Sequence, residues 1–183
     1  MQRIGQPNIQ LHFAYPDILK HEGTLLDYGC GTGDDIRALI KDGFPKKNIT
    51  GYDIDWGNIK IGCDFYLDEE AIKDIFVVSK QFPFEESSFD IIYSGSILHV
   101  LSNIENVREY LKHVFAVLKN NGIFFGSTLG NVDNSIRTRR PRVFFMKESE
   151  LTNVLREHHF SKVKVQSSFA DNRTRLWFNA EKS

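Results

Sequence analysis

Hydrophobic and polar residues follow two patterns along the chain: short apolar runs, and segments in which apolar residues recur at helical spacing. Ile36 and Ile40 share one face of a helix predicted over residues 34–41, which Gly43 ends. Short apolar runs bounded by Gly, Asn, Asp or Pro predict buried strands. We expect such strands over residues 24–28, 48–53, 75–79, 89–95 and 123–129.

The longest predicted helix begins at a capping box formed by Ser102 and Glu105. Apolar residues then recur every three or four positions until residues 120–122, Asn-Asn-Gly, end the element. Two more helices are predicted, over residues 58–71 with a break near Asp64 and over residues 149–158.

The order of these elements predicts an α/β fold. Strands that alternate with helices require crossover connections, which produce a mostly parallel sheet covered on both faces. Residues 162–169 and 175–180 flank a polar turn, so they add an antiparallel hairpin at one edge. We expect residues 1–183 to form a single domain around one core.

The first 22 residues carry no strong period, and Pro7 and Pro16 interrupt them. Two interpretations stay open for this N-terminal arm. It forms either a short helix or an ordered lid that lies over a ligand.

Composition excludes several classes of protein. Hydrophobic residues make up 41% and charged residues 26% of the chain, as in ordinary globular domains. The net charge of −1 disfavours a nucleic-acid partner, because such proteins usually carry a basic excess. The sequence contains neither a signal-peptide core nor an apolar run long enough for a bilayer. We therefore expect no membrane partner and a cytoplasmic location.

The stretch LLDYGCGTGD, residues 25–34, joins the end of a strand to the start of a helix through three glycines. Glycine permits backbone dihedrals closed to other residues, and the free amides at a helix start can bind an anionic group. Dinucleotide-binding turns read G-x-G-x-x-G/A. Here the third glycine comes one position early and Asp34 fills the last slot, so another cofactor is favoured.

This stretch resembles the first motif of class I S-adenosylmethionine-dependent methyltransferases, D/E-x-G-x-G-x-G, with Asp27, Gly29, Gly31 and Gly33 in the motif's positions. Three later segments resemble the family in the same order: ITGYDID, PFEESSFDIIYSGSILHVL and LKNNGIFFGS. The segments LIKDGFPKKNITGYDID, FYLD and IYSGSILHVL are also similar to small fungal methyltransferases of secondary metabolism.

The resemblance implies a Rossmann-like, doubly wound sheet of seven strands in the order 3-2-1-4-5-7-6, with the hairpin at its C-terminal end. It implies S-adenosyl-L-methionine as the cofactor. Asp53 and the nearby Asp55 would hold the ribose, and Asp27 would orient the turn or bind the cofactor's amino group through water.

The resemblance implies less about the adenine. Many relatives carry an acid before the Pro-Phe segment, where this chain has Val78. We expect adenine recognition by backbone groups near Ser79, with Phe82 packed on the ring. Ser94, at the end of the fourth strand, completes the predicted cofactor-binding residues.

Two residues are the main candidates for a general base that would take a proton from the acceptor. His99 follows the fourth strand and a histidine suits base chemistry near neutral pH, although a structural capping role is the alternative. Tyr15 lies in the N-terminal arm. The remaining candidates are His12, Tyr93, Ser94 and Ser96. No carboxylate set of the magnesium-dependent kind follows the fourth and fifth strands, so we expect no metal.

The basic run RTRRPR follows the fifth strand, where enzymes with parallel sheets place substrate loops. Arg137 and Arg140 would form a clamp for a substrate carboxylate, since arginine binds carboxylates with two parallel hydrogen bonds. A solvated basic loop and a phosphate-binding patch for RNA are the alternatives.

We therefore expect a metal-independent methyltransferase that acts on oxygen, a hydroxyl or a carboxylate, of a small and largely apolar metabolite. The 15 phenylalanines are consistent with an apolar pocket. Two alternatives stay open: an RNA or protein methyltransferase, and an inactive cofactor-binding partner subunit. The pocket of so short a chain would be closed by the arm or by a second copy in a homodimer.

Overall fold

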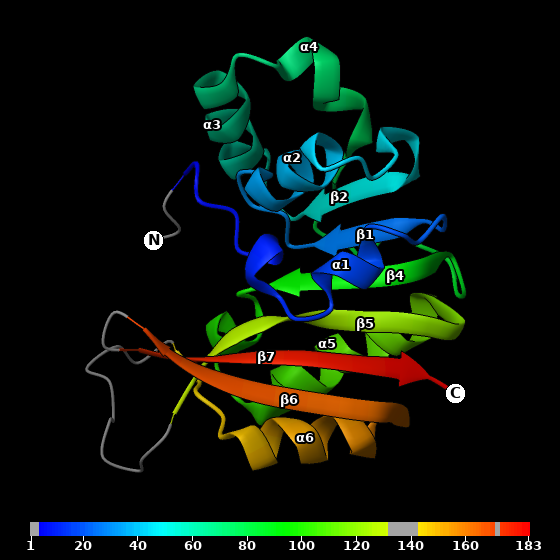
Figure 1. The fold of residues 1–183 in the computed structure, drawn as a ribbon, viewed down its shortest axis with the longest axis vertical. Helices are drawn as coiled ribbons and strands as arrows, with labels where there is room; N and C mark the ends of the chain where they lie inside the picture. The colour runs from blue at the N-terminus through cyan, green and yellow to red at the C-terminus, as the bar shows by residue number, and fades with distance from the viewer. Residues whose placement is uncertain (1–3, 132–142, 171–172) are drawn as a thin grey trace.

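A computed structural model describes residues 4–131, 143–170 and 173–183 of the chain. Its strands form one seven-stranded sheet in the order β3-β2-β1-β4-β5-β7-β6 (Figure 1). The strands from β1 to β5 pair in parallel, whereas β7 pairs antiparallel with both β5 and β6. The predicted strand order and the terminal hairpin are therefore confirmed. The strands are β1 Leu25–Tyr28, β2 Ile49–Asp53, β3 Phe76–Val78, β4 Phe89–Gly95, β5 Leu118–Gly130, β6 Phe160–Ala170 and β7 Arg173–Lys182.

Helices cover both faces of the sheet. One buried cluster joins α2 and α3 to the face that carries Phe125, and the other joins α5 and α6 to the face that carries Phe124. Adjacent strand residues point to opposite faces, which explains how these two neighbours enter different clusters. The helices are α1 Tyr15–Ile18, α2 Asp34–Lys41, α3 Trp56–Tyr66, α4 Glu69–Ile72, α5 Ile104–Val117 and α6 Glu148–Glu157, with short 3-10 turns η1 Ile9–Leu11, η2 Lys46–Asn48, η3 Lys73–Ile75 and η4 Leu98–Val100.

Both ends of α5 differ from the prediction. The capping residue is Asn103, whose side chain accepts the Asn106 N–H at 2.9 Å, so the assignment of the cap to Ser102 was wrong. The helix ends at Val117, and the residues expected to terminate it lie inside β5 instead. Asn121 has a φ of 61° there, which asparagine tolerates better than most residues.

The break in the second predicted helix also lies elsewhere. α3 continues past Asp64 to Tyr66 and is ended by Leu67, which adopts a left-handed conformation with a φ of 55°. A short α4 follows. The sequence offered no glycine or asparagine at this position to mark the end of the helix.

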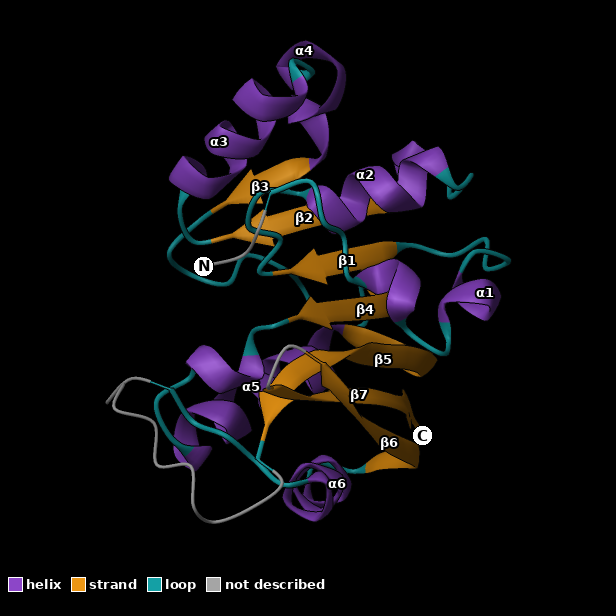
Figure 2. Cartoon of the chain, turned by 60° about the vertical axis from the view of Figure 1, so that its left-hand side comes forward, coloured by secondary structure: helices purple, strands orange, loops and turns teal. Residues whose placement is uncertain are grey.

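The parallel strands all end at one edge of the sheet, on the left in Figures 1 and 2. The turn after β1 lies at this edge, and the described start of the chain reaches it. α1 lies toward the opposite edge, where β1 and β4 begin (Figure 2). Open parallel sheets bind their ligands outside the carboxyl ends of the strands. We call this side of the sheet, where the parallel strands β1 to β5 end, the ligand edge. Among the described residues, no helix is long and apolar enough to cross a membrane.

Candidate active site

Three glycines shape the turn between β1 and α2. Gly29, Gly31 and Gly33 have φ angles of 80°, 55° and 72°, in the left-handed region that favours glycine. The Gly29 N–H donates to the Tyr52 carbonyl oxygen at 2.8 Å, which ties the turn to β2. A Cβ at Gly29 would lie 2.3 Å from Cδ1 of Ile97. The turn therefore needs glycine here for both its dihedral angles and its close packing.

The two acids at the end of β2 have different roles in the structure. Asp53 accepts the Gly31 N–H through Oδ2 at 2.9 Å and the Ile54 N–H through Oδ1 at 2.8 Å. Asp55 caps α3 by accepting the Gly57 N–H at 3.0 Å. Asp53 thus belongs to the turn, whereas Asp55 has a local role that the sequence analysis missed. Binding of ribose by either stays a prediction.

Asp27 is a deeply buried acid of the site, with only 2% of its surface exposed. Burial raises the pKa of Asp27 well above its usual range, and the negative charges of Asp35 and Asp53 raise it further. Asp34 and Asp35, in the first turn of α2, are buried as well. None of the ion pairs between described residues includes any of these four acids.

The first turn of α2 holds the N-terminal arm. Asp35 accepts the N–H groups of Asn8 and Ile9 through Oδ1, at 2.6 and 2.9 Å. Asp34 accepts the Gly5 N–H at 3.1 Å. The arm therefore begins next to the glycine turn. Its action as a lid stays a prediction.

His12 fixes the other end of the arm to the sheet. Its Nδ1 accepts the Ala14 N–H at 3.0 Å, so Nε2 carries the hydrogen and donates to the Phe178 carbonyl oxygen at 3.0 Å. Burial lowers the pKa of His12 to about 4, which keeps the ring neutral. Both ring nitrogens are used in structural hydrogen bonds, which leaves neither for proton transfer.

The residues expected near the adenine lie in two places. Ser79 accepts the Tyr52 hydroxyl through its carbonyl oxygen at 2.9 Å and lies at the ligand edge. Phe82 stacks against Tyr28 and His113, with ring centroids 4.9 and 5.4 Å apart. Phe82 thus belongs to an aromatic cluster between β1 and α5, and its contact with adenine stays a prediction.

The end of β4 carries two buried hydroxyls. Ser94 has no exposed surface and accepts the Tyr110 hydroxyl at 2.9 Å, so its side chain faces α5. Tyr93 faces the other way and donates to Asp35 at 3.1 Å. Any contribution of Ser94 to cofactor binding would come from its backbone.

His99 lies beyond the end of β4, beside β5. Its Nδ1 accepts the Leu129 N–H at 3.3 Å and lies 3.3 Å from Oγ1 of Thr128. Burial, followed by the positive charge of Arg175, lowers the pKa of His99 to about 4. The neutral ring therefore carries its hydrogen on Nε2 and is prepared to donate a hydrogen bond rather than to accept a proton. A catalytic role for His99 stays a prediction.

The structure does not bring Tyr15 to the glycine turn. Its hydroxyl donates to Asp42 at 2.8 Å, at the C-terminal end of α2, whereas the turn lies at the N-terminal end (Figure 2). Burial, then the hydrogen bond to Asp42, raises the pKa of Tyr15. The predicted substrate residues Arg137 and Arg140 lie outside the described residues. Within the described ranges, no cluster of His, Cys, Asp and Glu could hold a metal.

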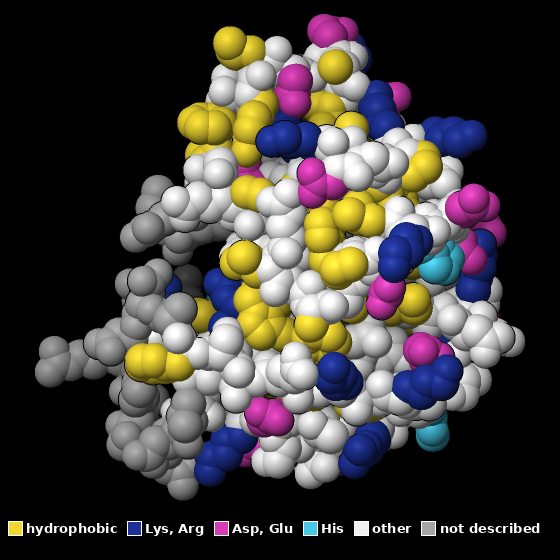
Figure 3. Space-filling view, in the orientation of Figure 1, with side chains coloured by type: hydrophobic (Ala, Val, Ile, Leu, Met, Phe, Trp, Pro, Cys, Tyr) yellow, Lys and Arg dark blue, Asp and Glu magenta, His cyan; other side chains and the backbone are white. Residues whose placement is uncertain are grey.

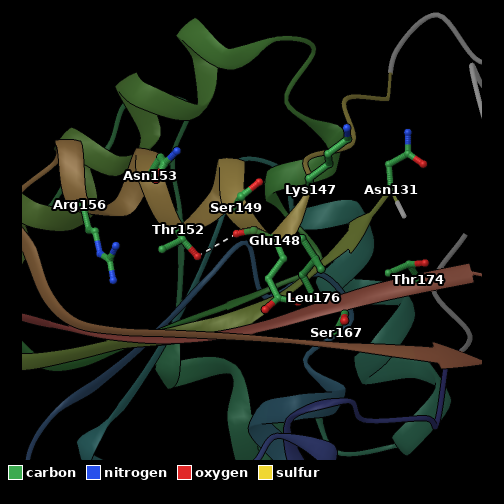
Figure 4. A pocket seen from close by; sticks show the side chains of 10 residues that line it. All are labelled: Asn131, Lys147, Glu148, Ser149, Thr152, Asn153, Arg156, Ser167, Thr174 and Leu176. Carbon is green, nitrogen blue, oxygen red and sulfur yellow. Dashed lines mark hydrogen bonds between the residues drawn. The ribbon is translucent and has the colours of Figure 1, made fainter. Parts of the chain in front are cut away.

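A groove of about 580 Å³ lies between α6 and the hairpin (Figure 4). Most of the residues that line it are polar or charged, and Lys147, Thr152 and Arg156 lie on the α6 side. Ser167 and Leu176 form part of the opposite wall. None of the glycine-turn residues lines this groove, so it is separate from the candidate active site.

Sequence reasoning did not single out Arg175, nor Asp35 of the first turn of α2. Arg175 lies in β7 directly opposite Leu129 of β5, and its Nη1 donates to the Ser127 hydroxyl at 3.0 Å. The pattern of the terminal hairpin was visible in the sequence. The register that places this side chain at the ligand edge was not.

The fold and the glycine turn define a Rossmann-like domain of the class I methyltransferase type. The chain belongs to the family of methyltransferase domains, whose model matches residues 3–165. This confirms the resemblance drawn from the four sequence segments.

The chain is similar to methyltransferases of fungi. The chain is 28% identical to O-methyltransferase phiE of Fungal sp. (strain ATCC 74256) over 145 residues, which cover 72% of this chain and 48% of that protein. It is 32% identical to methyltransferase adrK of Penicillium roqueforti over 112 residues, which cover 53% of this chain and 40% of that protein. The chain thus matches less than half the length of these relatives.

Solved structures share the fold at low sequence identity. A SAM-dependent methyltransferase of Methanosarcina mazei superposes with a TM-score of 0.72 at 21% identity, covering 92% of this chain and 97% of that one. A Burkholderia thailandensis 1,6-didemethyltoxoflavin-N1-methyltransferase, solved with its substrate and S-adenosylhomocysteine, superposes with a TM-score of 0.75 at 21% identity. That match covers 98% of this chain and 78% of that one.

Proposed function

We propose that this chain binds S-adenosyl-L-methionine at the glycine turn and transfers its methyl group to oxygen of a small, largely apolar metabolite. The observation that carries the proposal is the set of four acids around the turn: Asp27, Asp34, Asp35 and Asp53. Three of them are buried, and no ion pair between described residues neutralises them.

The chemistry of this site fits the cofactor. Closely spaced carboxyl groups in a buried setting favour a ligand that brings positive charge. S-adenosylmethionine carries a sulfonium and an α-ammonium group, and it supplies a methyl group whose departure the sulfonium charge already favours. Burial, followed by the negative charges of Asp35 and Asp53, raises the pKa of Asp27, and a positively charged ligand would favour its ionised form.

The residues of the chain would divide the work of binding. Asp53 accepts the N–H groups of Ile54 and Asp55 through Oδ1 and that of Gly31 through Oδ2, and the capacity that Oδ2 retains is suited to a ribose hydroxyl. Gly33 ends the turn immediately before α2, so the first amides of the helix can meet the methionine carboxylate. Positioning is the main task left to the protein in a displacement of this kind.

Apolar side chains at the ligand edge support an apolar acceptor. Val100 and Phe169 are 55% and 71% exposed, and Ile54 at the end of β2 is 63% exposed. Figure 3 shows hydrophobic side chains, in yellow, at several places on this face of the molecule, including its left side. An oxygen acceptor is supported by the name of the relative phiE, an O-methyltransferase.

Calorimetry with S-adenosylhomocysteine tests the cofactor assignment. Asp53→Asn keeps the shape of the side chain but loses its charge and one acceptor, so we expect affinity to fall about tenfold or more. Asp64→Asn, on the exposed side of α3, is the matched control and should bind as the wild type does. Absence of binding to the wild type, or equal binding by Asp53→Asn, would contradict the proposal.

A further inference from the structure

The guanidinium of Arg175, at the ligand edge, donates hydrogen bonds to two serine hydroxyls rather than to a carboxylate of the described residues. Nη1 of Arg175 donates to the Ser127 hydroxyl at 3.0 Å and to the Ser96 hydroxyl at 3.4 Å. The guanidinium lies 5.3 Å from the centre of the Trp177 ring. The ion pairs between described residues do not include Arg175.

Arg37 shows how this fold satisfies a partly buried arginine. Its Nε and Nη2 donate to the two carboxylate oxygens of Asp68, each at 2.8 Å, and its Nη1 donates to the Thr32 carbonyl oxygen at 2.7 Å. Among the described residues no carboxylate forms an ion pair with Arg175, and burial lowers the pKa of Arg175 although the negative charge of Asp35 acts in the opposite direction. A desolvated charge whose described hydrogen-bond partners are neutral hydroxyls is costly, and a bound anion would offset that cost.

The position of Arg175 matches the place of an acceptor. Ser96 follows β4 directly, and its N–H donates to the Ser127 carbonyl oxygen at 2.8 Å, so both hydroxyl partners lie at the carboxyl ends of β4 and β5. His99, held by the Leu129 N–H, lies beside the same strand end. The glycine turn lies at the end of the adjacent β1.

The site offers a guanidinium but little that could act as a base. His99 accepts a backbone N–H through Nδ1, His12 uses both ring nitrogens within the arm, and Tyr15 lies at the far end of α2. An acceptor whose oxygen is already ionised needs no base. Guanidinium groups bind oxyanions through paired hydrogen bonds.

We propose that Arg175 binds an anionic oxygen group of the methyl acceptor, which makes it a specificity-determining residue for small acidic metabolites such as carboxylic acids or acidic enols. This inference rests on the proposed function and names the charge of its substrate. In the transfer, a bond forms between the acceptor oxygen and the methyl carbon while the carbon–sulfur bond breaks. The negative oxygen and the positive sulfur both become neutral, and no proton moves.

Binding of matched probes tests the role of Arg175 without turnover. The probes are naphthaleneacetate and its neutral amide, naphthaleneacetamide, titrated by calorimetry into protein loaded with S-adenosylhomocysteine. We expect the wild type to prefer the carboxylate by about tenfold or more, as charge-assisted hydrogen bonds to a desolvated guanidinium would give. Arg175→Met should lose this preference, Arg175→Lys should keep part of it, and Arg156→Met, on the exposed side of α6, should keep all of it.

Three outcomes would overturn the inference. The wild type could bind both probes equally, or Arg175→Met could retain the preference. Arg175→Met could also lose affinity for S-adenosylhomocysteine itself, which would assign the guanidinium to the cofactor's carboxylate. Arg175→Lys and circular dichroism of each variant separate a loss of binding from a loss of folding. If the wild type fails to bind S-adenosylhomocysteine at all, the proposed function fails first and independently.

Discussion

Asp53 and Gly31 form one structural unit, in which the carboxylate at the end of β2 accepts the amide of the second glycine at 2.9 Å. The same carboxylate also accepts the Ile54 N–H. Asp53 is therefore oriented before any ligand arrives, and its loss would loosen the turn as well as remove a ribose partner. A change at Asp53 has to be compared with a change that affects the turn alone.

Gly29→Ala provides that comparison. The φ of 80° and the 2.3 Å approach of a Cβ to Ile97 predict a loss of about 1–3 kcal/mol in the free energy of unfolding. The double variant Gly29→Ala/Ile97→Ala relieves the contact but leaves the unfavourable dihedral, so it should recover only part of the loss caused at Gly29. Urea unfolding of Gly29→Ala, Ile97→Ala and the double variant measures this, and full recovery relative to Ile97→Ala would show that the dihedral angle carries no cost.

Asp27→Asn should stabilise the ligand-free protein and weaken its binding of the cofactor. The folded state raises the pKa of Asp27, so it holds this proton more tightly than the unfolded state does. The free energy of unfolding therefore falls as pH rises above the ordinary aspartate pKa of about 4. Asparagine removes that penalty. In thermal melts between about pH 5 and 8, where most proteins are at their most stable, the melting temperature of Asp27→Asn should rise relative to that of the wild type as pH rises. A lower melting temperature of Asp27→Asn than of the wild type at neutral pH would contradict the prediction.

His12 should make the protein sensitive to acid. Its pKa is about 4 when folded, against about 6.5 in the unfolded chain, so the unfolded state binds protons first as pH falls. Stability is thus lost between these two values, by about 1–3 kcal/mol from this group. His12→Gln should flatten the decline measured by urea unfolding across this range, whereas His159→Asn, at an exposed position, should leave it unchanged. An equal decline in both variants would rule out His12 as its source.

Asp55 should matter for stability and little for the cofactor. Its side chain caps α3, so Asp55→Ala should cost about 1 kcal/mol, while Asp55→Asn, which can still cap, should cost less. We expect both variants to bind S-adenosylhomocysteine within about twofold of the wild type. A large loss of affinity in Asp55→Asn would restore the ribose role inferred from the sequence.

The sheet was predictable because its signals are local. The apolar runs that became β1, β2 and β4 end at polar residues that the family resemblance could place, and the three glycines identified the turn itself. The start of α5 was less certain because Ser102 and Asn103 are adjacent and both are good caps. Residues 120–122 looked like the end of a helix, but strand pairing between β4 and β5 takes them into the sheet.

The roles of individual side chains depend on contacts between distant segments. Tyr15 was a candidate base because it lies in the N-terminal arm, yet its hydroxyl donates to Asp42 at the C-terminal end of α2, away from the glycine turn. The use of both ring nitrogens of His12 depends on Phe178 in the last strand. Arg175 reaches Ser96 only through the antiparallel register of β5 and β7. No spacing in the sequence encodes these relationships.

The arrangement of the chain ends has a practical consequence. The arm enters beside the glycine turn, where Gly5 donates to Asp34, whereas the last strand carries the C-terminus toward the opposite side of the molecule (Figure 1). An affinity tag fused ahead of the arm would be joined to the chain only a few residues before Gly5, and it would compete with small molecules for the space at the ligand edge. A C-terminal tag would leave that edge free, so binding constants should be measured on protein purified in that way.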